Sequence, residues 1–363
     1  VVSQLLSQEE GVSSHFVLGT KKEYTNLRDK RRALETDKDF VSIAEARDQK
    51  LKLDWANYHP TIPVQTGVKV WDNIRVSDLV PYIDWTPFFS SWQLKGKYPD
   101  IFNDPYVGKE AQILYDHARE MLADIIKEGR LSVRAITGIF EANSEGDDVV
   151  IYSEGSTQVC DTIHFLRQQR KRAEGLPYMC LSDFVLPAES GRRDYFGAFA
   201  VTAGIGIEPW VKQYEDSHDD YNAILMKALA DRLAEAAAEY LHEKMRKEVW
   251  GYAAGEALGN EELIDEKYTG IRPAPGYPAC PDHTQKDTLW RLMDVESKTG
   301  IRLTESKAMY PAASVSGWYI AHPESRYFGL GQICKDQVSD YAKRKQMNVN
   351  EAERWLAPNL SYQ

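Results

Sequence analysis

Residues 270–281 carry the residue types best suited to holding a small ligand. The segment reads GIRPAPGYPACP, with four prolines and a single cation, Arg272. Proline fixes the backbone and has no N–H group, so we expect an extended loop without strand partners, whose remaining polar groups face a ligand. The planar guanidinium of Arg272 suits a carboxylate, which it can bind through two parallel hydrogen bonds. A rigid connector would explain the prolines equally well, and the loop alone leaves both interpretations open.

A second candidate is Asp84, which lies in the aromatic run YIDWTPFF at residues 82–89. A carboxylate among aromatic rings can balance an ammonium or sulfonium cation, because ring faces also attract cations. The same side chain can instead close an Asx turn, and the local sequence alone favours that interpretation. One acid, one arginine and nearby tyrosines would together suit a zwitterionic amino-acid ligand.

Carboxylates also repeat along a long predicted helix. Asp231, Glu235 and Glu239 are four residues apart and His242 follows, so they share one helix face. A Glu-x-x-His pair can ligate a di-metal centre, but that architecture needs a second such helix, which we do not find. We favour a polar face bonded to neighbours or water, and we predict no metal site. Alanine and leucine neighbours indicate that Asp231 and Glu235 are partly buried.

Other catalytic patterns are missing. Gly204 and Gly206 follow a predicted strand, but a dinucleotide fingerprint needs a third glycine and a helix start. No G-x-S-x-G nucleophile motif occurs. The four cysteines are far apart, which predicts reduced, structural thiols rather than a zinc or disulfide framework.

Charge and hydropathy restrict the partners. The 363 residues include 44 Lys and Arg against 55 Asp and Glu, a net charge of −11. Such a surface repels nucleic acid and anionic lipid. The most apolar run, residues 195–207, is shorter than the roughly 20 residues of a membrane helix and contains three glycines, so it predicts a buried strand. We therefore expect no nucleic-acid or membrane partner and a cytoplasmic location. The start of the sequence, without methionine or signal peptide, indicates a piece of a longer polypeptide.

The elements that must position these residues follow from periodicity and turn signals. We predict hairpins at 133–153 and 314–333, and strands at 180–186 and 195–203. Helices are predicted at 107–127, around Phe165, at 220–252, from a capping box at Asp282 to Gly300, at 337–345 and at 351–356. Segregated hairpins and helices favour an α+β fold, a central antiparallel twisted sheet with flanking helices. The charged stretch 19–50 predicts a helical linker, and we place the start of a single large domain at residue 40.

Residues 270–278 closely resemble the Arg-x-x-x-Gly-Tyr-Pro signature of the C-terminal activation domain of cobalamin-dependent methionine synthase. Further blocks resemble the same family, namely residues 82–89, 219–221, 227–236, 303–306, 314–317 and 353–358. The resemblance extends in order from about residue 40 to the C-terminus. Residues 1–39 resemble the end of the preceding cobalamin-binding domain and the linker.

The resemblance implies a domain that binds S-adenosylmethionine and repairs the cofactor. In this family, cobalamin oxidised to inactive cob(II)alamin is methylated reductively, with an electron from flavodoxin or an equivalent reductase. The cobalamin would be held by a neighbouring domain absent here, and the zinc of the full-length enzyme would also lie outside this chain. The chain alone is not expected to methylate homocysteine, although the whole enzyme is a methyltransferase.

The same resemblance implies the binding residues. Asp84, Arg272, Tyr327 and Phe328 match positions that hold S-adenosylmethionine, with Arg272 on its carboxylate and Asp84 on its ammonium group. Further contacts are implied for four residues: Glu235, Ala274, Gly276 and Tyr277. Asp231 is implied to contact the cobalamin domain, and no catalytic acid or base is implied, because methyl transfer from a sulfonium needs positioning rather than proton transfer.

Two other functions remain open from the sequence. A stand-alone S-adenosylmethionine-dependent methyltransferase would need its own acceptor pocket, and usually a glycine-rich nucleotide loop. A docking module would bind partner domains without affinity for a small molecule. Ligand binding by the chain separates these alternatives.

Overall fold

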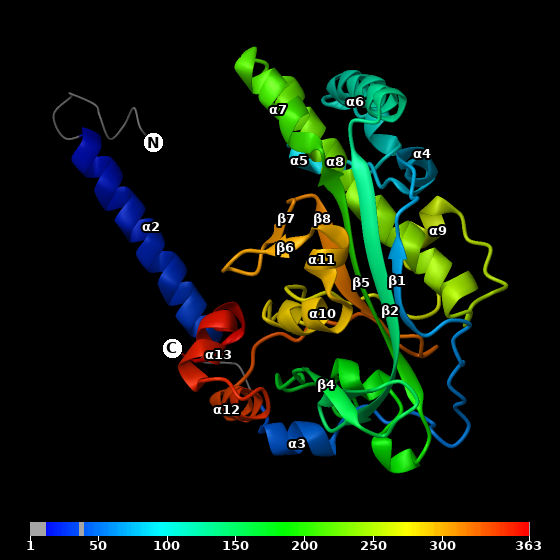
Figure 1. Ribbon diagram of the computed structural model, residues 1–363. Coiled ribbons are helices and arrows are strands. Elements are labelled where there is room, and N and C mark those ends of the chain that lie inside the picture. Colours follow the sequence, from blue (N-terminus) through cyan, green and yellow to red (C-terminus); the bar gives the residue numbers. More distant parts are fainter. Residues whose placement is uncertain (1–11, 36–39, 363) are drawn as a thin grey trace.

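The computed structural model describes residues 12–35 and 40–362. The second range contains a central antiparallel sheet with helices on both faces (Figure 1). The strand order is β4-β3-β2-β5-β8, and β1 pairs with β2 on the same side as β3. The strands of this sheet are β1 (Gly67–Trp71), β2 (Ser132–Glu145), β3 (Asp148–Tyr152), β4 (Val159–His164), β5 (Asp194–Ile205) and β8 (Ser314–Tyr319). A separate two-stranded sheet joins β6 (Arg302–Leu303) to β7 (Met309–Tyr310).

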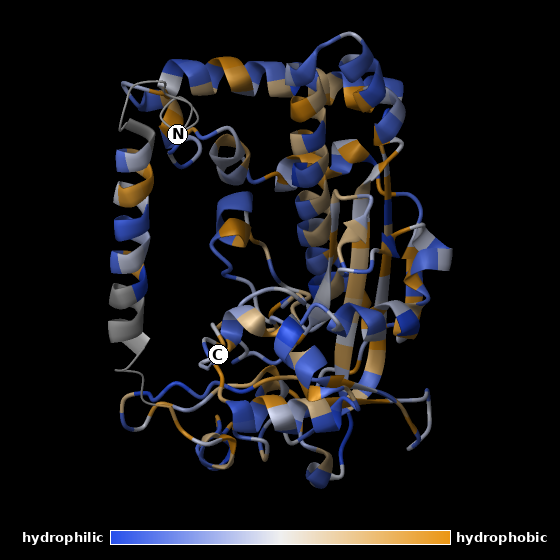
Figure 2. Cartoon of the chain, turned by 90° about the vertical axis from the view of Figure 1, so that its left-hand side faces the viewer, coloured by the Kyte–Doolittle hydropathy of each residue, from blue (hydrophilic) through white to orange (hydrophobic). Residues whose placement is uncertain are grey.

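Strand β5 is buried on both faces, which explains why its sequence is a continuous apolar run rather than an alternating one. Phe199, Val201 and Ala203 pack into the core on the side of the long helices, whereas Phe196 and Ala198 pack into the core on the opposite side. Because successive side chains of a strand point to opposite faces, the single sheet separates two hydrophobic cores. Orange, hydrophobic positions follow the strands in Figure 2.

The long helices cover one face of the sheet. They are α6 (Gly108–Glu128), α7 (Ile207–Asp216) and α8 (Asp220–Lys244), and α8 continues into a π-helical turn at Met245–Val249. The shorter helices near this core are α4 (Val76–Leu79), α5 (Thr86–Ser91) and α9 (Asn260–Ile264). Helices α10 (Gln285–Met293) and α11 (Val295–Thr299) contribute to the core on the other face. Helix α8 supplies buried alanines and leucines along most of its length, so it forms a rigid platform behind the sheet.

The C-terminal helices form a smaller third core. Helices α12 (Lys335–Arg344) and α13 (Val349–Trp355) pack around Ile333, Tyr341 and Leu356. Arg47 of helix α3 (Ile43–Asp48) ties that helix to this unit through a 2.5 Å ion pair with Asp340, and to the turn between β2 and β3 through a 2.7 Å ion pair with Asp147. No helix within the described ranges has the length and apolar character needed to cross a membrane.

The α+β fold, the hairpin of β2 and β3, and helices α6 and α8 confirm the sequence predictions. Residues 180–186, however, contain a 3-10 turn at Leu181–Phe184 instead of a strand. The turn forms because Asp183 accepts the backbone N–H of Cys180 and pairs with the buried Arg167. A short apolar run cannot reveal such a polar anchor.

Three other predictions were wrong in detail. No helix forms at Phe165, where the chain leaves β4 in an extended path. The helix predicted after Asp282 is broken at Asp294, which has a left-handed φ of 54°. The Asp282 carboxylate accepts the N–H of Thr284 at 2.8 Å and pairs with Lys345 at 2.7 Å, but the predicted capping box with Gln285 does not form. The second arm of the predicted hairpin 314–333 is a loop at residues 327–330 rather than a strand.

The segment before the domain contains helix α2 (Val12–Glu35). Leu18 and Leu27 of α2 are 67% and 54% exposed, and the helix stands away from the sheet in Figures 1 and 2. Residues 1–11 and 36–39, which carry the start of the predicted tail and the predicted boundary, lie outside the described residues. The assignment of residues 1–39 to a preceding domain and linker, and the domain limits 40–363, stay predictions.

Candidate ligand-binding site

A cavity of about 470 Å³ lies between α8, strands β5 and β8, and the proline-rich segment 270–281, which we call the 270s loop. This volume is in the range of small-molecule sites. Its lining comprises Phe199, Glu235, Glu266, Arg272, Pro273, Ala274, Tyr277, Pro278, Ala279, Val315, Tyr327, Phe328 and Gly329. The lining combines apolar side chains with a few convergent charged and phenolic groups, which is the usual character of a specific ligand site.

The first half of the 270s loop is not free of strand partners, which corrects the expectation from its prolines. Ile271 and Ile320 exchange two backbone hydrogen bonds of 3.0 Å, and the N–H of Trp318 donates to the carbonyl of Pro273 at 2.8 Å. Pro273 lacks a donor but keeps its acceptor, so it still pairs with the strand. At Gly317 of β8, an added Cβ would lie 2.7 Å from that Pro273 oxygen, so the close approach of loop and strand requires glycine.

The second half of the loop turns sharply at Gly276. Its φ is +98°, and its N–H donates to the carbonyl of Cys280 at 2.7 Å. A Cβ at this position would lie 2.2 Å from Cε1 of His283, so both the backbone angle and the ring behind it exclude other residues. This turn presents Tyr277 to the cavity.

Arg272 is held from several sides before any ligand arrives. Its Nη1 lies 2.5 Å from Glu239 of α8 and donates to the Tyr268 hydroxyl at 3.2 Å. Its backbone N–H donates to the Tyr327 hydroxyl at 2.9 Å. Burial opposes the charge, but Glu239 and the two tyrosines outweigh it, so the pKa of Arg272 rises above its ordinary value. The side chain keeps 22% exposure and belongs to the cavity lining.

A second layer of charges lies behind Arg272. Arg246 is fully buried, 3.6 Å from Glu239 and 2.7 Å from Glu256, so acids and bases alternate away from the cavity. His242 stacks on Tyr319, and burial together with Arg246 and Arg272 lowers its pKa well below the ordinary value. His242 is therefore neutral at physiological pH. The spacing of Glu239 and His242 on α8 places both side chains against Arg272.

Two carboxylates in the cavity lining, Glu235 and Glu266, form no hydrogen bond or ion pair with any side chain in the described ranges. Partial burial raises the pKa of Glu266, although Arg272 opposes this effect. Burial, and then Glu235, raise the pKa of the Tyr277 hydroxyl. One guanidinium and two open carboxylates around an apolar wall suit a zwitterion that carries an additional positive charge.

Six of the residues singled out from the sequence line this cavity: Glu235, Arg272, Ala274, Tyr277, Tyr327 and Phe328. Gly276 shapes the wall without lining it. Asp84 is not part of the lining, and its carboxylate accepts the N–H of Thr86 at 2.9 Å, which is the Asx turn that the local sequence favoured. Asp231 is exposed on α8, one turn before Glu235.

Sequence reasoning missed Glu266. It follows helix α9 in an irregular segment and has a positive φ of 56°. No motif or periodicity marks it, because its place in the lining depends on how this segment folds back beside Arg272. An acid six residues before the one arginine of the loop was the only available signal.

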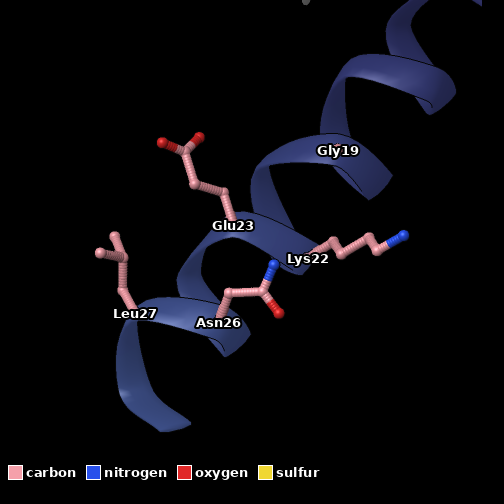
Figure 3. Close-up of a pocket in the computed structure, with 5 residues that line it drawn as sticks. All are labelled: Gly19, Lys22, Glu23, Asn26 and Leu27. Carbon is pink, nitrogen blue, oxygen red and sulfur yellow. The ribbon is translucent and has the colours of Figure 1, made fainter. Parts of the chain in front are cut away.

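Two other hollows are less suited to a zwitterionic ligand. A larger one, about 540 Å³, has Arg119 as its single charged lining residue and contains no carboxylate. Another is lined only by Gly19, Lys22, Glu23, Asn26 and Leu27, all from helix α2 (Figure 3). This hollow lies on the surface of a single helix without a second wall, so we do not consider it a ligand-binding site. In the part of the chain that the structure describes, no group of three His, Cys, Asp or Glu side chains is arranged to hold a metal ion.

Comparison with known proteins shows the family of the chain. The profile described as "Vitamin B12 dependent methionine synthase, activation domain" matches residues 75–346. The crystal structure of the MetH reactivation domain bound to AdoHcy is similar, with 54% sequence identity and a TM-score of 0.87. The match covers 89% of this chain and 99% of that chain. The chain belongs to the family of activation domains of vitamin B12-dependent methionine synthase, a methyltransferase.

Proposed function

We propose that this chain binds S-adenosylmethionine in the cavity at Arg272 and presents its methyl group for the reductive methylation of a cobalamin held by a neighbouring domain. The observation that carries the proposal is the charge pattern of the cavity, whose lining includes one guanidinium and two carboxylates without side-chain partners. S-adenosylmethionine has one carboxylate and two cationic groups, the ammonium and the sulfonium, so the charges correspond in sign and number. The AdoHcy-bound relative supports a ligand of this class.

Under this proposal, each charged group of the ligand has its own partner residue. Arg272 holds the carboxylate, and Glu266, which lines the same cavity, takes the ammonium group. Glu235 lies beside Tyr277 and faces the sulfonium. Ala274 and Phe328 supply apolar wall, with Tyr327 fixing the Arg272 backbone. The resemblance assigned the ammonium group to Asp84 instead; that contact stays a prediction and is an alternative to Glu266, because Asp84 lies outside the cavity lining. A contact between Asp231 and the cobalamin domain also stays a prediction.

The role of the protein in this reaction is positioning. When bound in the neighbouring domain, the corrin supplies the metal nucleophile that accepts the methyl group, and a flavodoxin-type donor supplies one electron. The cavity holds the sulfonium in one orientation at an open mouth, so that the cobalamin meets the methyl group in a fixed orientation. Methyl loss removes the positive charge at sulfur, so Glu235 would hold the substrate more tightly than the product. We also propose that zinc, folate and homocysteine sites lie elsewhere in the full-length enzyme, and that it is cytoplasmic.

Calorimetric titration of the chain with S-adenosylmethionine and with S-adenosylhomocysteine tests this proposal. We expect one-to-one binding of both, with the sulfonium ligand preferred. E266Q should weaken both ligands roughly tenfold, because both carry the ammonium group, whereas E235Q should reduce mainly the preference for the sulfonium. E261Q on the exposed face of α9 is the matched control and should bind like wild type.

Absence of binding by the folded wild-type chain would contradict the proposal and favour the docking-module alternative. Methyl transfer to an added acceptor by the chain alone would instead favour a stand-alone methyltransferase.

A further inference from the structure

A small hollow of about 270 Å³ adjoins the ligand cavity and is lined by cations. Its lining comprises Gln168, Arg170, Lys171, Arg172, Gly329, Leu330 and Gly331. We call Arg170, Lys171 and Arg172 the basic rim. Every charged group in this lining is positive, although the chain as a whole has a net charge of −11. Three adjacent cations repel one another. Lys171 has an interaction within the chain, so Arg170 is the cation of the rim that matters for an external partner.

The basic rim is fixed to the ligand cavity. Gly329 lines both hollows, and Nε2 of Gln168 donates to the Gly329 carbonyl at 2.7 Å. The next residue, Leu330, donates its N–H to the carbonyl of Pro278 in the 270s loop at 2.8 Å. Any macromolecule that covers the mouth of the ligand cavity on the Gly329 side therefore lies against the basic rim.

The basic rim is also where the chain enters the domain. Phe40 forms an antiparallel bridge with Arg170, and the N–H of Val41 donates to the carbonyl of Gln169 at 3.0 Å. Nε2 of Gln169 returns a 3.0 Å hydrogen bond to the carbonyl of Val41. A domain that precedes α2 would thus be connected to this one by a segment that enters beside these cations, which raises the effective concentration of that domain near the rim.

Arg170 is available for an external partner. Its side chain is exposed, and no hydrogen bond or ion pair links it to another described residue. Arg172 differs, because its guanidinium donates to Oε1 of Gln168 and so is held along the segment. The rim thus presents an unpaired arginine between the tether and the ligand cavity.

We propose that the basic rim is the docking surface for an acidic face of the cobalamin-carrying domain of the same polypeptide. The inference rests on the proposed function, because methyl transfer requires that domain to cover the ligand cavity. The tether at Phe40 and the shared wall at Gly329 favour this occupant over the electron donor, which needs no access to the methyl group. Electrostatic attraction at the rim orients the tethered domain and increases the rate of productive docking.

The test uses the full-length enzyme and the variants R170E and R170K. Reactivation of oxidised enzyme is followed with S-adenosylmethionine and a small-molecule reductant in place of the protein electron donor. We expect R170E to slow reactivation roughly three- to tenfold at low salt, as expected for reversal of one exposed charge at a docking surface. The deficit should shrink at high salt, where surface charges are screened. R170K should behave nearly as wild type.

The control K109E reverses one exposed charge on α6, far along the chain from the basic rim. Equal rates for R170E and K109E would overturn the inference. A deficit that appears only with the protein electron donor would assign the rim to that donor and would also overturn it. S-adenosylmethionine titration of R170E should match wild type, and a wild-type enzyme without S-adenosylmethionine-dependent reactivation would refute the proposed function instead.

Discussion

Removal of the Arg272 side chain should have two separable costs, one in ligand binding and one in folding. The guanidinium contacts the buried Glu239 at 2.5 Å, and the Arg272 side chain also lines the cavity. Loss of a charge-assisted contact to a ligand carboxylate costs about 1.5 to 3 kcal/mol, so R272A should weaken S-adenosylmethionine binding roughly 10- to 150-fold. R272K keeps the charge but loses the planar fork, and should fall between wild type and R272A.

The folding cost arises because R272A leaves the Glu239 carboxylate buried with a weaker partner. Breaking a fully buried ion pair costs about 3 to 5 kcal/mol. Here Arg246 remains 3.6 Å from Glu239, and Arg272 is 22% exposed to screening solvent. We therefore expect a smaller loss of about 2 kcal/mol in the free energy of unfolding. Urea unfolding measures this loss, and its slope checks that the folded states are comparable.

The double variant R272A/E239Q separates the two effects. Neutralising residue 239 removes the uncompensated charge, and Arg246 keeps Glu256 at 2.7 Å, so roughly half of the lost stability should return. Ligand binding should not return, because the cavity still lacks a cation. Unchanged affinity in R272A, or restored affinity in the double variant, would refute the assignment of Arg272 to the ligand carboxylate.

Three further predictions concern the surroundings of the site. Burial raises the pKa of Asp194 to about 6, so its contribution opposes folding once the carboxylate ionises, and stability should fall as the pH rises from about 4 to about 6. D194N should flatten this part of a melting temperature against pH curve, and an unchanged fall would show that another group is responsible. G317A should weaken S-adenosylmethionine binding roughly tenfold, since its Cβ meets the Pro273 carbonyl at 2.7 Å and displaces the loop; calorimetry that finds wild-type affinity would contradict this. R47A should lower the free energy of unfolding by about 1 to 2 kcal/mol, because Arg47 anchors α3 through its two aspartate partners. Amide hydrogen exchange should then rise in α3 before it rises in the rest of the domain, and uniform exchange would argue against a local anchor.

The sequence predicted those elements whose pattern is local. Helix α8 and the β2–β3 hairpin have clear periodicity and turn signals, and both formed where expected. Residues 180–186 are mostly apolar, which suits a strand, and only the buried Arg167, anchored to Asp183, decides for a turn at residues 181–184. That interaction joins residues that a propensity argument treats separately.

The candidate site likewise contains residues that a local sequence pattern marks and residues whose place depends on distant contacts. Arg272 and Tyr277 were visible because prolines and glycine isolate them in a distinctive loop. The partner of Arg272, Glu239, was visible only as part of a helix face, and its 2.5 Å contact depends on the loop pairing with the extension of β8. Glu266 could not be predicted, because its place in the cavity depends on an irregular segment.

The way Glu239, Tyr268 and Tyr327 restrain Arg272 affects the entropy of ligand binding. A free arginine side chain has about 2 kcal/mol of rotamer entropy to lose when it is immobilised. In this fold Glu239 of α8 and the Tyr268 hydroxyl restrain the side chain, and the Tyr327 hydroxyl fixes its backbone, so most of that loss accompanies folding of the domain. The incoming carboxylate then meets a guanidinium that is already oriented, and the ordering of this side chain subtracts little from ligand affinity.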